Sequence, residues 1–226
     1  MTNFQGLMTK KTHLTFHNIA IGIIWLFHLC GILGILYGDS QWFVGATPLN
    51  LSLCFVLLML TSRQASKVYI VAFVAFIVGM VAEALGVNYG LIFGHYQYGE
   101  ALGWKIAGVP FLIGVNWAIL VICCGAIAAD LAGNFFTKVL LGVGLMLLLD
   151  FVIEPIAPIL DFWEFTDGVA PAQNYIGWFA VALPLHFLYQ GLKIELKGNF
   201  THHLFLLQVI FFTILLLQIN TLQNAL

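Results

Sequence analysis

Long apolar runs alternate with short polar segments along the whole chain of 226 residues. A helix that crosses the hydrocarbon core of a bilayer, about 30 Å thick, needs roughly 20 predominantly apolar residues. The pattern therefore predicts an all-α integral membrane protein, a bundle of about seven transmembrane helices in a single polytopic domain over residues 1–226. The predicted spans are Phe16–Tyr37, Pro48–Thr61, Val68–Leu85, Ile106–Ala128, Phe135–Ile153, Ile176–Gln190 and His203–Ile219.

Basic residues are distributed unevenly between the two ends of these predicted helices. Seven of the eight Lys and Arg residues precede the first span, lie in the second, fourth or sixth loop or, in the case of Lys138, lie in the first turn of the span that follows the fourth loop. Lys105 is the exception. Because basic residues are enriched in cytoplasmic loops, we expect a cytoplasmic N-terminus and an external C-terminus. An odd number of spans requires the same arrangement, and a bacterial inner membrane is the expected location.

Composition excludes several functional classes. Hydrophobic residues make up 62% of the chain and charged residues 8%, with a mean hydropathy of +1.00. The net charge of −2 and the lack of a basic patch predict the lipid bilayer as a partner and no nucleic acid. No histidine metal motif, P-loop, GxGxxG or GxSxG occurs, so we expect no metal and no cofactor. The four cysteines lie inside predicted spans and are expected to be packing residues.

Two predicted external loops are rich in glycine and aromatic residues. Gly86–Lys105 has a glycine every four or five residues with tyrosines between them, and Pro155–Tyr175 begins with two closely spaced prolines. Non-helical backbone at membrane depth persists only where it is buried in protein or lines a cavity. We therefore expect a re-entrant or irregular segment that helps to form a pocket on the external side. The alternative is an aromatic belt at the membrane interface.

Three carboxylates, Glu83, Asp150 and Glu154, lie at the ends of long apolar runs, where a charge costs several kcal/mol unless it is protonated, paired or functional. Asp150 and Glu154 are four residues apart and share one helix face, and the predicted topology brings all three acids to the external leaflet. They could hold helices together through hydrogen bonds. Alternatively, a protonated and an ionised carboxyl could act as an acid and a base. His95 is the histidine favoured for function, whereas the roles of His28 and His186 stay open.

Several sequence blocks occur in order between residues 83 and 178. They include EALGVNYG from Glu83, FGHYQY from Phe93, DFVIEP from Asp150, LDFW from Leu160 and PAQNYIGW from Pro171. Together these blocks resemble the carotenoid 1,2-hydratase family of membrane proteins. The chain departs from the family pattern at Phe165, where the family has a second tryptophan. In size and carboxylate usage it is also similar to the small membrane lycopene cyclases.

This resemblance implies hydration of the terminal 1,2 (1′,2′) double bond of an acyclic carotenoid end group, as in lycopene or γ-carotene, without a cofactor. Protonation of the alkene would give a tertiary cation that aromatic faces can stabilise, and a carboxylate would take a proton from the attacking water. The partner would be a membrane-embedded carotenoid. The candidate catalytic residues are Asp150, Glu154 and Glu83, and the candidate substrate-binding residues are Tyr89, His95, Tyr96, Tyr98, Trp117, Asp161, Trp163, Asn174 and Trp178.

Two other functions are compatible with the same residues. In a lycopene-type cyclase, a double bond of the substrate would capture the cation in place of water. In a non-enzymatic carrier or transporter, the acids would relay protons, although clustering near one leaflet disfavours this. Which acid donates the proton, which carotenoid is the substrate, the oligomeric state, and association with other enzymes of carotenoid synthesis are left open by the sequence.

Overall fold

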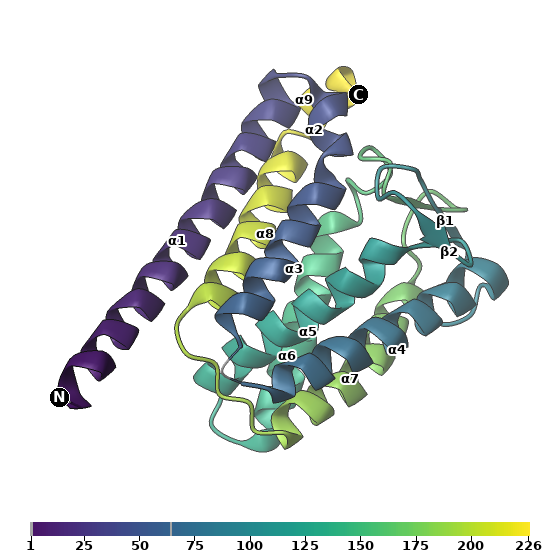
Figure 1. Ribbon diagram of the computed structural model, residues 1–226. Coiled ribbons are helices and arrows are strands. Elements are labelled where there is room, and N and C mark those ends of the chain that lie inside the picture. The colour runs from purple at the N-terminus through teal and green to yellow at the C-terminus, as the bar shows by residue number, and fades with distance from the viewer. Residues whose placement is uncertain (1, 64) are drawn as a thin grey trace.

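Long helices packed side by side form most of the molecule (Figure 1). The computed structural model describes residues 2–63 and 65–226, with side chains from residue 16 onward except at 225. The side chains of Lys10 and Lys11, used above for the topology, therefore lie outside the described ones. The helices are α1 (Thr2–Tyr37), α2 (Ser40–Gly45), α3 (Thr47–Thr61), α4 (Lys67–Tyr89), α5 (Phe111–Leu131), α6 (Phe135–Ile153), α7 (Ala172–Gly191), α8 (Phe200–Leu217) and α9 (Ile219–Ala225).

Within the described residues, six helical segments are long and apolar enough to cross a membrane. This confirms the prediction of an all-α membrane protein. The predicted second span is longer than expected, because α2 and α3 together give the apolar segment Ser40–Thr61. The six segments are Phe16–Tyr37, Ser40–Thr61, Lys67–Tyr89, Phe111–Leu131, Phe135–Ile153 and Phe200–Leu217.

Helix α7, which contains the predicted span Ile176–Gln190, runs antiparallel to α4 over its whole length. At one end, Lys67 Nζ donates to the carbonyl of Leu192 at 2.8 Å; at the other, Gln173 Nε2 donates to the carbonyl of Gly90 at 3.1 Å. Because α4 is one of the six segments, α7 covers the same depth of the bundle, although α7 itself is not among those six. The N- and C-terminal ends accordingly lie at opposite ends of the bundle (Figure 1).

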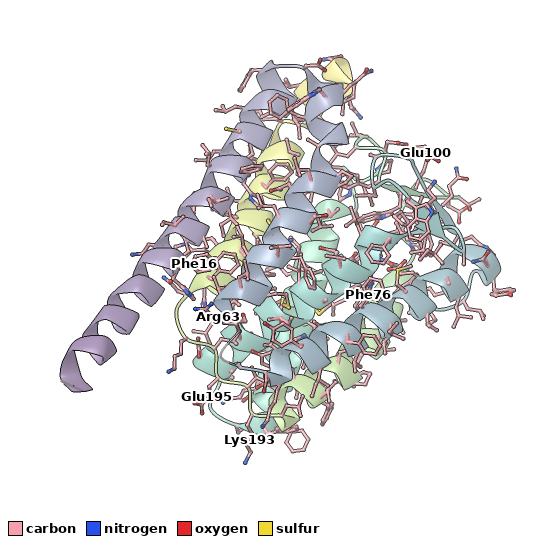
Figure 2. All side chains as sticks on the ribbon, in the orientation of Figure 1. Phe16, Arg63, Phe76, Glu100, Lys193 and Glu195 are labelled. Atoms are coloured by element: carbon pink, nitrogen blue, oxygen red, sulfur yellow. The ribbon has the colours of Figure 1, made fainter. Side chains whose placement is uncertain are left out.

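Labelled charged side chains lie at the two ends of the bundle (Figure 2). Arg63, Lys193 and Glu195 are at the end where α4 begins, Glu100 is at the opposite end, and Phe76 lies between them. The central helix is α5, of which 83% of the apolar segment is buried, against 22–39% for the other five. The exposed apolar faces of those outer helices suit contact with lipid chains.

The glycine- and aromatic-rich loops form two small antiparallel sheets at the end where α4 and α6 terminate. Strand β1 (Tyr96–Tyr98) pairs with β4 (Trp163–Phe165) and so joins these two loops. The segment is irregular, as predicted, and no re-entrant helix occurs among the residues described.

The second sheet explains why α5 begins later than the sequence predicted. Strands β2 (Lys105–Ile106) and β3 (Val109–Pro110) form a hairpin. Its two turn residues, Ala107 and Gly108, have φ values of 51° and 82°. Two consecutive positive φ values are typical of the tight turns that join antiparallel strands. The apolar residues from Ile106 to Pro110 therefore belong to this hairpin, and α5 starts at Phe111.

Candidate active site

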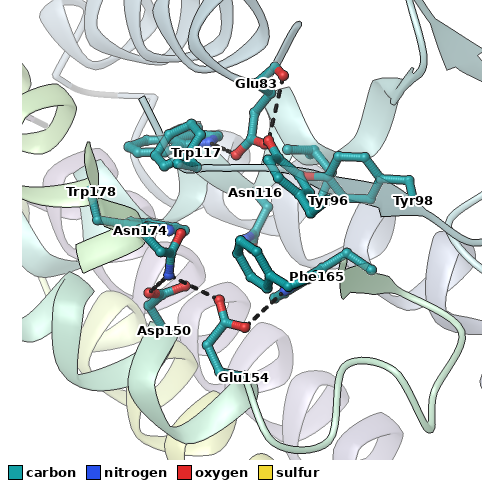
Figure 3. A pocket seen from close by; sticks show the side chains of 13 residues that line it. Glu83, Tyr96, Tyr98, Asn116, Trp117, Asp150, Glu154, Phe165, Asn174 and Trp178 are labelled. Atoms are coloured by element: carbon teal, nitrogen blue, oxygen red, sulfur yellow. Dashed lines mark hydrogen bonds between the residues drawn. The ribbon is translucent and has the colours of Figure 1, made fainter. Parts of the chain in front are cut away.

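The three carboxylates predicted from the sequence face one small cavity (Figure 3). Its volume is about 30 Å³, whereas one water needs roughly 10–15 Å³. The cavity therefore has room for about two water molecules. Helices α4, α5, α6 and α7 and the β1–β4 sheet surround it. Its lining residues are Glu83, Phe93, Tyr96, Tyr98, Ile113, Asn116, Trp117, Asp150, Glu154, Trp163, Phe165, Asn174 and Trp178.

On the α4 side, Glu83 is buried and accepts hydrogen bonds from three side-chain donors. The phenols of Tyr96 and Tyr98 donate to Oε2, the latter at 2.8 Å, and the indole of Trp117 donates to Oε1 at 3.0 Å. An ionised carboxylate only accepts hydrogen bonds, and it offers about four lone-pair positions. The three donor groups around Glu83 therefore complement the ionised form and leave one position free.

The two tyrosines on β1 are suited to remain donors. Burial raises the pKa of Tyr96 and of Tyr98, and the neighbouring Glu83 carboxylate raises both further. Both phenols therefore keep their protons well beyond physiological pH. Both phenols reach Glu83 because Tyr96 and Tyr98 are alternate residues of a strand and therefore point to the same face.

Two glycines of α4 make room for the aromatic donors around Glu83. A Cβ atom on Gly79 would lie 2.4 Å from Cγ of Trp117, and one on Gly86 would lie 2.7 Å from Oη of Tyr96. Gly79, Glu83 and Gly86 are spaced four and three residues apart and thus share one helix face. The aromatic rings rest on the bare backbone at the two glycines, and their polar atoms reach the carboxylate between them.

We expect Gly79→Ala to destabilise the folded protein by about 1–3 kcal/mol, as is usual for overpacking. The new methyl group would meet the base of the Trp117 side chain, which cannot move without disturbing its bond to Glu83. Thermal unfolding in detergent measures this. Gly144→Ala in α6 is the matched control, because nothing lies within 4 Å of a Cβ there. Equal unfolding temperatures for the two variants would contradict this packing.

Across the cavity, Asp150 and Glu154 form an acid pair linked by Asn174. The amide nitrogen of Asn174 donates to Oδ2 of Asp150 at 3.0 Å and to Oε1 of Glu154 at 3.1 Å. The indole of Trp163 donates to Oε2 of Glu154 at 3.2 Å. Two like charges so close together in a buried site disfavour each other's ionisation. The pair is therefore suited to hold one proton between its two carboxyl groups.

Local sequence explains how this pair is positioned. Asp150 and Glu154 lie one turn apart where α6 ends, and Pro155 cannot continue the hydrogen-bonding pattern of the helix. Asn174 lies in the first turn of α7, just after Pro171. Burial raises the pKa of Glu154, against the opposing effect of its hydrogen bonds from Trp163 and Asn174. A carboxyl group with a raised pKa is a better proton reservoir at neutral pH.

Aromatic rings form much of the remaining wall. Trp117 and Trp178 are stacked, with ring centroids 4.4 Å apart and an angle of 17° between their planes. Phe93 packs against both of them, with its ring centroid 6.4 Å from that of Trp117 and 6.3 Å from that of Trp178. Aromatic faces attract cations through the ring quadrupole. The wall can therefore stabilise a positive charge on an otherwise apolar ligand.

Most of the predicted site residues come together here. Besides the three acids, the cavity is lined by Tyr96, Tyr98, Trp117, Trp163, Asn174 and Trp178.

Tyr89, His95 and Asp161 lie outside the lining, which differs from the expectation. The side chain of Tyr89 is 69% exposed at the end of α4. The ring of His95 is over Gly90, where an added Cβ would lie 2.2 Å from it. Asp161 instead joins the two glycine- and aromatic-rich loops, because its Oδ2 accepts from the backbone N–H groups of Glu100 and Ala101 at 2.7 and 3.0 Å.

Four lining residues were missed from the sequence: Phe93, Ile113, Asn116 and Phe165. Three are apolar, and nothing in the sequence separates them from other packing residues. Asn116 did carry a signal, because it is a polar residue inside the apolar run of α5 and directly precedes Trp117. Polar residues in such runs are candidates for function.

The two histidines whose roles the sequence left open do not extend this site. Nδ1 of His28 bonds to the carbonyl of Ile24 in its own helix at 2.7 Å, and Nε2 of His186 lies 3.2 Å from the sulfur of Met146. A larger cavity of about 630 Å³ lies at the opposite end of the bundle, and its lining includes Asp130 and Glu195. Among the described residues, no group of three or more His, Cys, Asp or Glu residues is placed to hold a metal ion.

Comparison with protein families gives one match that covers most of the chain. The model of a family described as "Carotenoid biosynthesis protein" matches residues 42–225, a range that includes every lining residue of the cavity. Comparison with curated proteins and with solved structures finds no match. The helical bundle and its acidic, aromatic cavity are thus found in a chain that belongs to the family of carotenoid biosynthesis proteins and has a role in carotenoid biosynthesis.

Proposed function

We propose that the protein hydrates the terminal 1,2 double bond of an acyclic carotenoid end group. The observation that carries this proposal is the division of the carboxylates across one water-sized cavity. On one side, the Asp150–Glu154 pair shares a single amide donor group and is suited to hold a proton. On the other, Glu83 is surrounded by donors that favour its ionised form. An acid and a base therefore face the same space.

The first step is proton transfer from the acid pair to C2 of the alkene. The π electrons of the C1–C2 bond form the new C2–H bond, the O–H bond of the carboxyl breaks, and C1 becomes a tertiary cation. An unactivated alkene is a weak base, so the donor must be close and shielded from bulk water. Asp150 is only 3% exposed, which suits that role.

In the second step, water adds to the cation at C1. A water oxygen forms the C1–O bond and its proton passes to Glu83, which has one lone-pair position free. Trp117 and Trp178 offer their faces to the transient positive charge. Return of the proton from Glu83 to the acid pair restores the starting state. The net reaction is the addition of one water, without any external acid, base or cofactor.

Access to the cavity requires movement. A volume of about 30 Å³ is far below the several hundred Å³ that enclose a drug-sized ligand. The end group must therefore displace water and aromatic side chains as it enters from the membrane. Trp163 and Phe165 of β4 are the natural candidates to move, because this strand pairs only with the three residues of β1.

Expression in a bacterial host that accumulates lycopene tests this function. We expect the host to form carotenoids heavier by the mass of one water, or of two when both ends react, and to retain an open chain. Pigments of unchanged mass with a ring at one end would instead support the cyclase. A host whose pigments are untouched by the folded protein, with lycopene and with γ-carotene, would contradict the proposal.

The rate of hydration should depend on the protonation of the acid pair. Because burial raises the pKa of Glu154, we expect proton donation to persist above about pH 4, the ordinary range of a glutamic acid. Activity should then be lost as the pH rises through this raised pKa. Hydration by membranes, measured against pH, would show the alkaline limb, and Glu154→Gln should change its position. A profile without an alkaline limb would contradict proton donation by this pair.

A further inference from the structure

The side chain of Asn116 lies in the cavity without a hydrogen-bond partner among the described residues. It comes from the second turn of α5 and lines the cavity together with Glu83 and the acid pair. In Figure 3 it appears between Glu83 above and Asp150 and Glu154 below. Neither Glu83 nor the Asp150–Glu154 pair therefore forms a hydrogen bond with its amide.

The other polar side chains of the lining are already engaged or chemically limited. Tyr96, Tyr98 and Trp117 donate to Glu83, and Trp163 and Asn174 donate to the acid pair. The indole of Trp178 has a single donor and no acceptor. Among the neutral lining side chains, this leaves Asn116 as the one with both a free donor group and a free acceptor.

Asn116 is half-buried, and an amide that lines a cavity without a protein partner is best satisfied by water. The cavity has room for about two waters, and its walls offer the polar partners that ordered water needs. A water that gives one proton to the amide oxygen of Asn116 can give the other to Glu83. Its oxygen lone pairs then remain free for a cation.

We infer that Asn116 holds the water molecule that adds to C1. This deepens the proposed function and rests on it. Asn116 acts as a positioning residue, since Glu83 accepts the proton and the acid pair donates it. Without a held water, the cation has no nucleophile within reach and must lose a proton again. The alkene is then regenerated, and the substrate leaves without gaining mass from water.

This difference is measurable in heavy water (D₂O). The acid pair then delivers deuterium to C2, and loss of the original hydrogen from C2 returns an alkene that keeps the deuterium. Asn116→Leu has nearly the same shape but no polar atoms. We expect it to lower hydration by about 10²-fold, the cost of a misplaced reactant, while deuterium still accumulates in recovered substrate. Asn116→Ser, which can bond to water, should retain more hydration than Asn116→Leu.

Asn50→Leu provides the matched control, because Asn50 lies on α3 outside the cavity lining. It should leave both hydration and deuterium uptake near the wild-type values. If Asn116→Leu is not recovered folded, Asn116→Val gives the same comparison.

Two results would overturn the inference. One is unchanged hydration in Asn116→Leu or Asn116→Val. The other is the parallel loss of hydration and deuterium uptake in a folded apolar variant, which would indicate a general structural role. Wild-type protein that neither hydrates nor exchanges would overturn the proposed function itself, so the two failures are distinguishable.

Discussion

Asp150→Asn is expected to lower the rate of carotenoid hydration by about 10²–10⁴-fold, the usual contribution of a positioned general acid. The substitution keeps the size of the side chain but removes the buried carboxyl that shares Asn174 with Glu154. Glu154 alone has no second carboxyl with which to share a proton, so proton transfer to C2 should become limiting. Pigment analysis in the lycopene-accumulating host measures the effect, with the amount of folded protein checked in membranes.

The matched control is Asp130→Asn at the end of α5. Asp130 is largely exposed and lies 3.4 Å from His202, far along the bundle from the acid pair. Its conversion to the amide should leave hydration unchanged. Equal activities for Asp150→Asn and the wild type would remove Asp150 from the mechanism and leave it a structural role between α6 and α7.

Glu83→Gln is expected to reduce both activity and stability. A glutamine offers one acceptor oxygen and one amide nitrogen, so its nitrogen must face donors that now bond to a carboxylate oxygen. Each buried donor left unpaired costs about 1–3 kcal/mol. Hydration should fall by about 10²-fold or more, because the base that accepts the water proton is lost. The unfolding midpoint in detergent and the rate of product formation measure the two effects.

Glu195→Gln at the opposite end of the bundle is the comparison for this variant, since its side chain is exposed. We expect it to unfold like the wild type. A Glu83→Gln variant of undiminished stability would mean that Glu83 is normally protonated, because a neutral acid and an amide fit the same partners. The assignment of Glu83 as the base would then be wrong.

Sequence patterns predicted that the three acids lie at the same end of the bundle. An acid in an apolar run is easily recognised, because burial of charge in a membrane is costly and therefore rare. Glu83 ends one apolar run, whereas Asp150 and Glu154 end another, and the alternation of spans brings both ends to one side. The alternate spacing of Tyr96 and Tyr98 likewise places both phenols near Glu83 once that segment is a strand. These residues were predictable because helix and strand periodicity determines their direction.

Other features depended on contacts that no local pattern contains. The pairing of β1 with β4 joins loops more than sixty residues apart, and it decides that Trp163 lines the cavity. The family resemblance placed Asp161 among the candidate substrate-binding residues, although its carboxylate accepts hydrogen bonds from backbone N–H groups of the other loop. His95 and Tyr89 follow the same glycine-rich pattern as Tyr96 but point elsewhere.

The start of α5 shows a related limit. Hydropathy alone extends the predicted span back to Ile106, because the hairpin Lys105–Pro110 contains mostly apolar residues. Its conformation is determined by two positive φ values at Ala107 and Gly108. An alanine does not indicate a turn with positive φ, because glycine and asparagine are the residues typical of such positions. An apolar segment before a helix therefore does not distinguish helix from hairpin.

The most direct test of the central claim is the source of the new oxygen atom. Membranes that contain the protein and an acyclic carotene would be incubated in water labelled with heavy oxygen, and the products analysed by mass spectrometry. The account predicts a tertiary alcohol at C1 that carries the label, formed by the wild type and nearly absent with Asp150→Asn. An unlabelled product, or a cyclic product of unchanged mass, would contradict it.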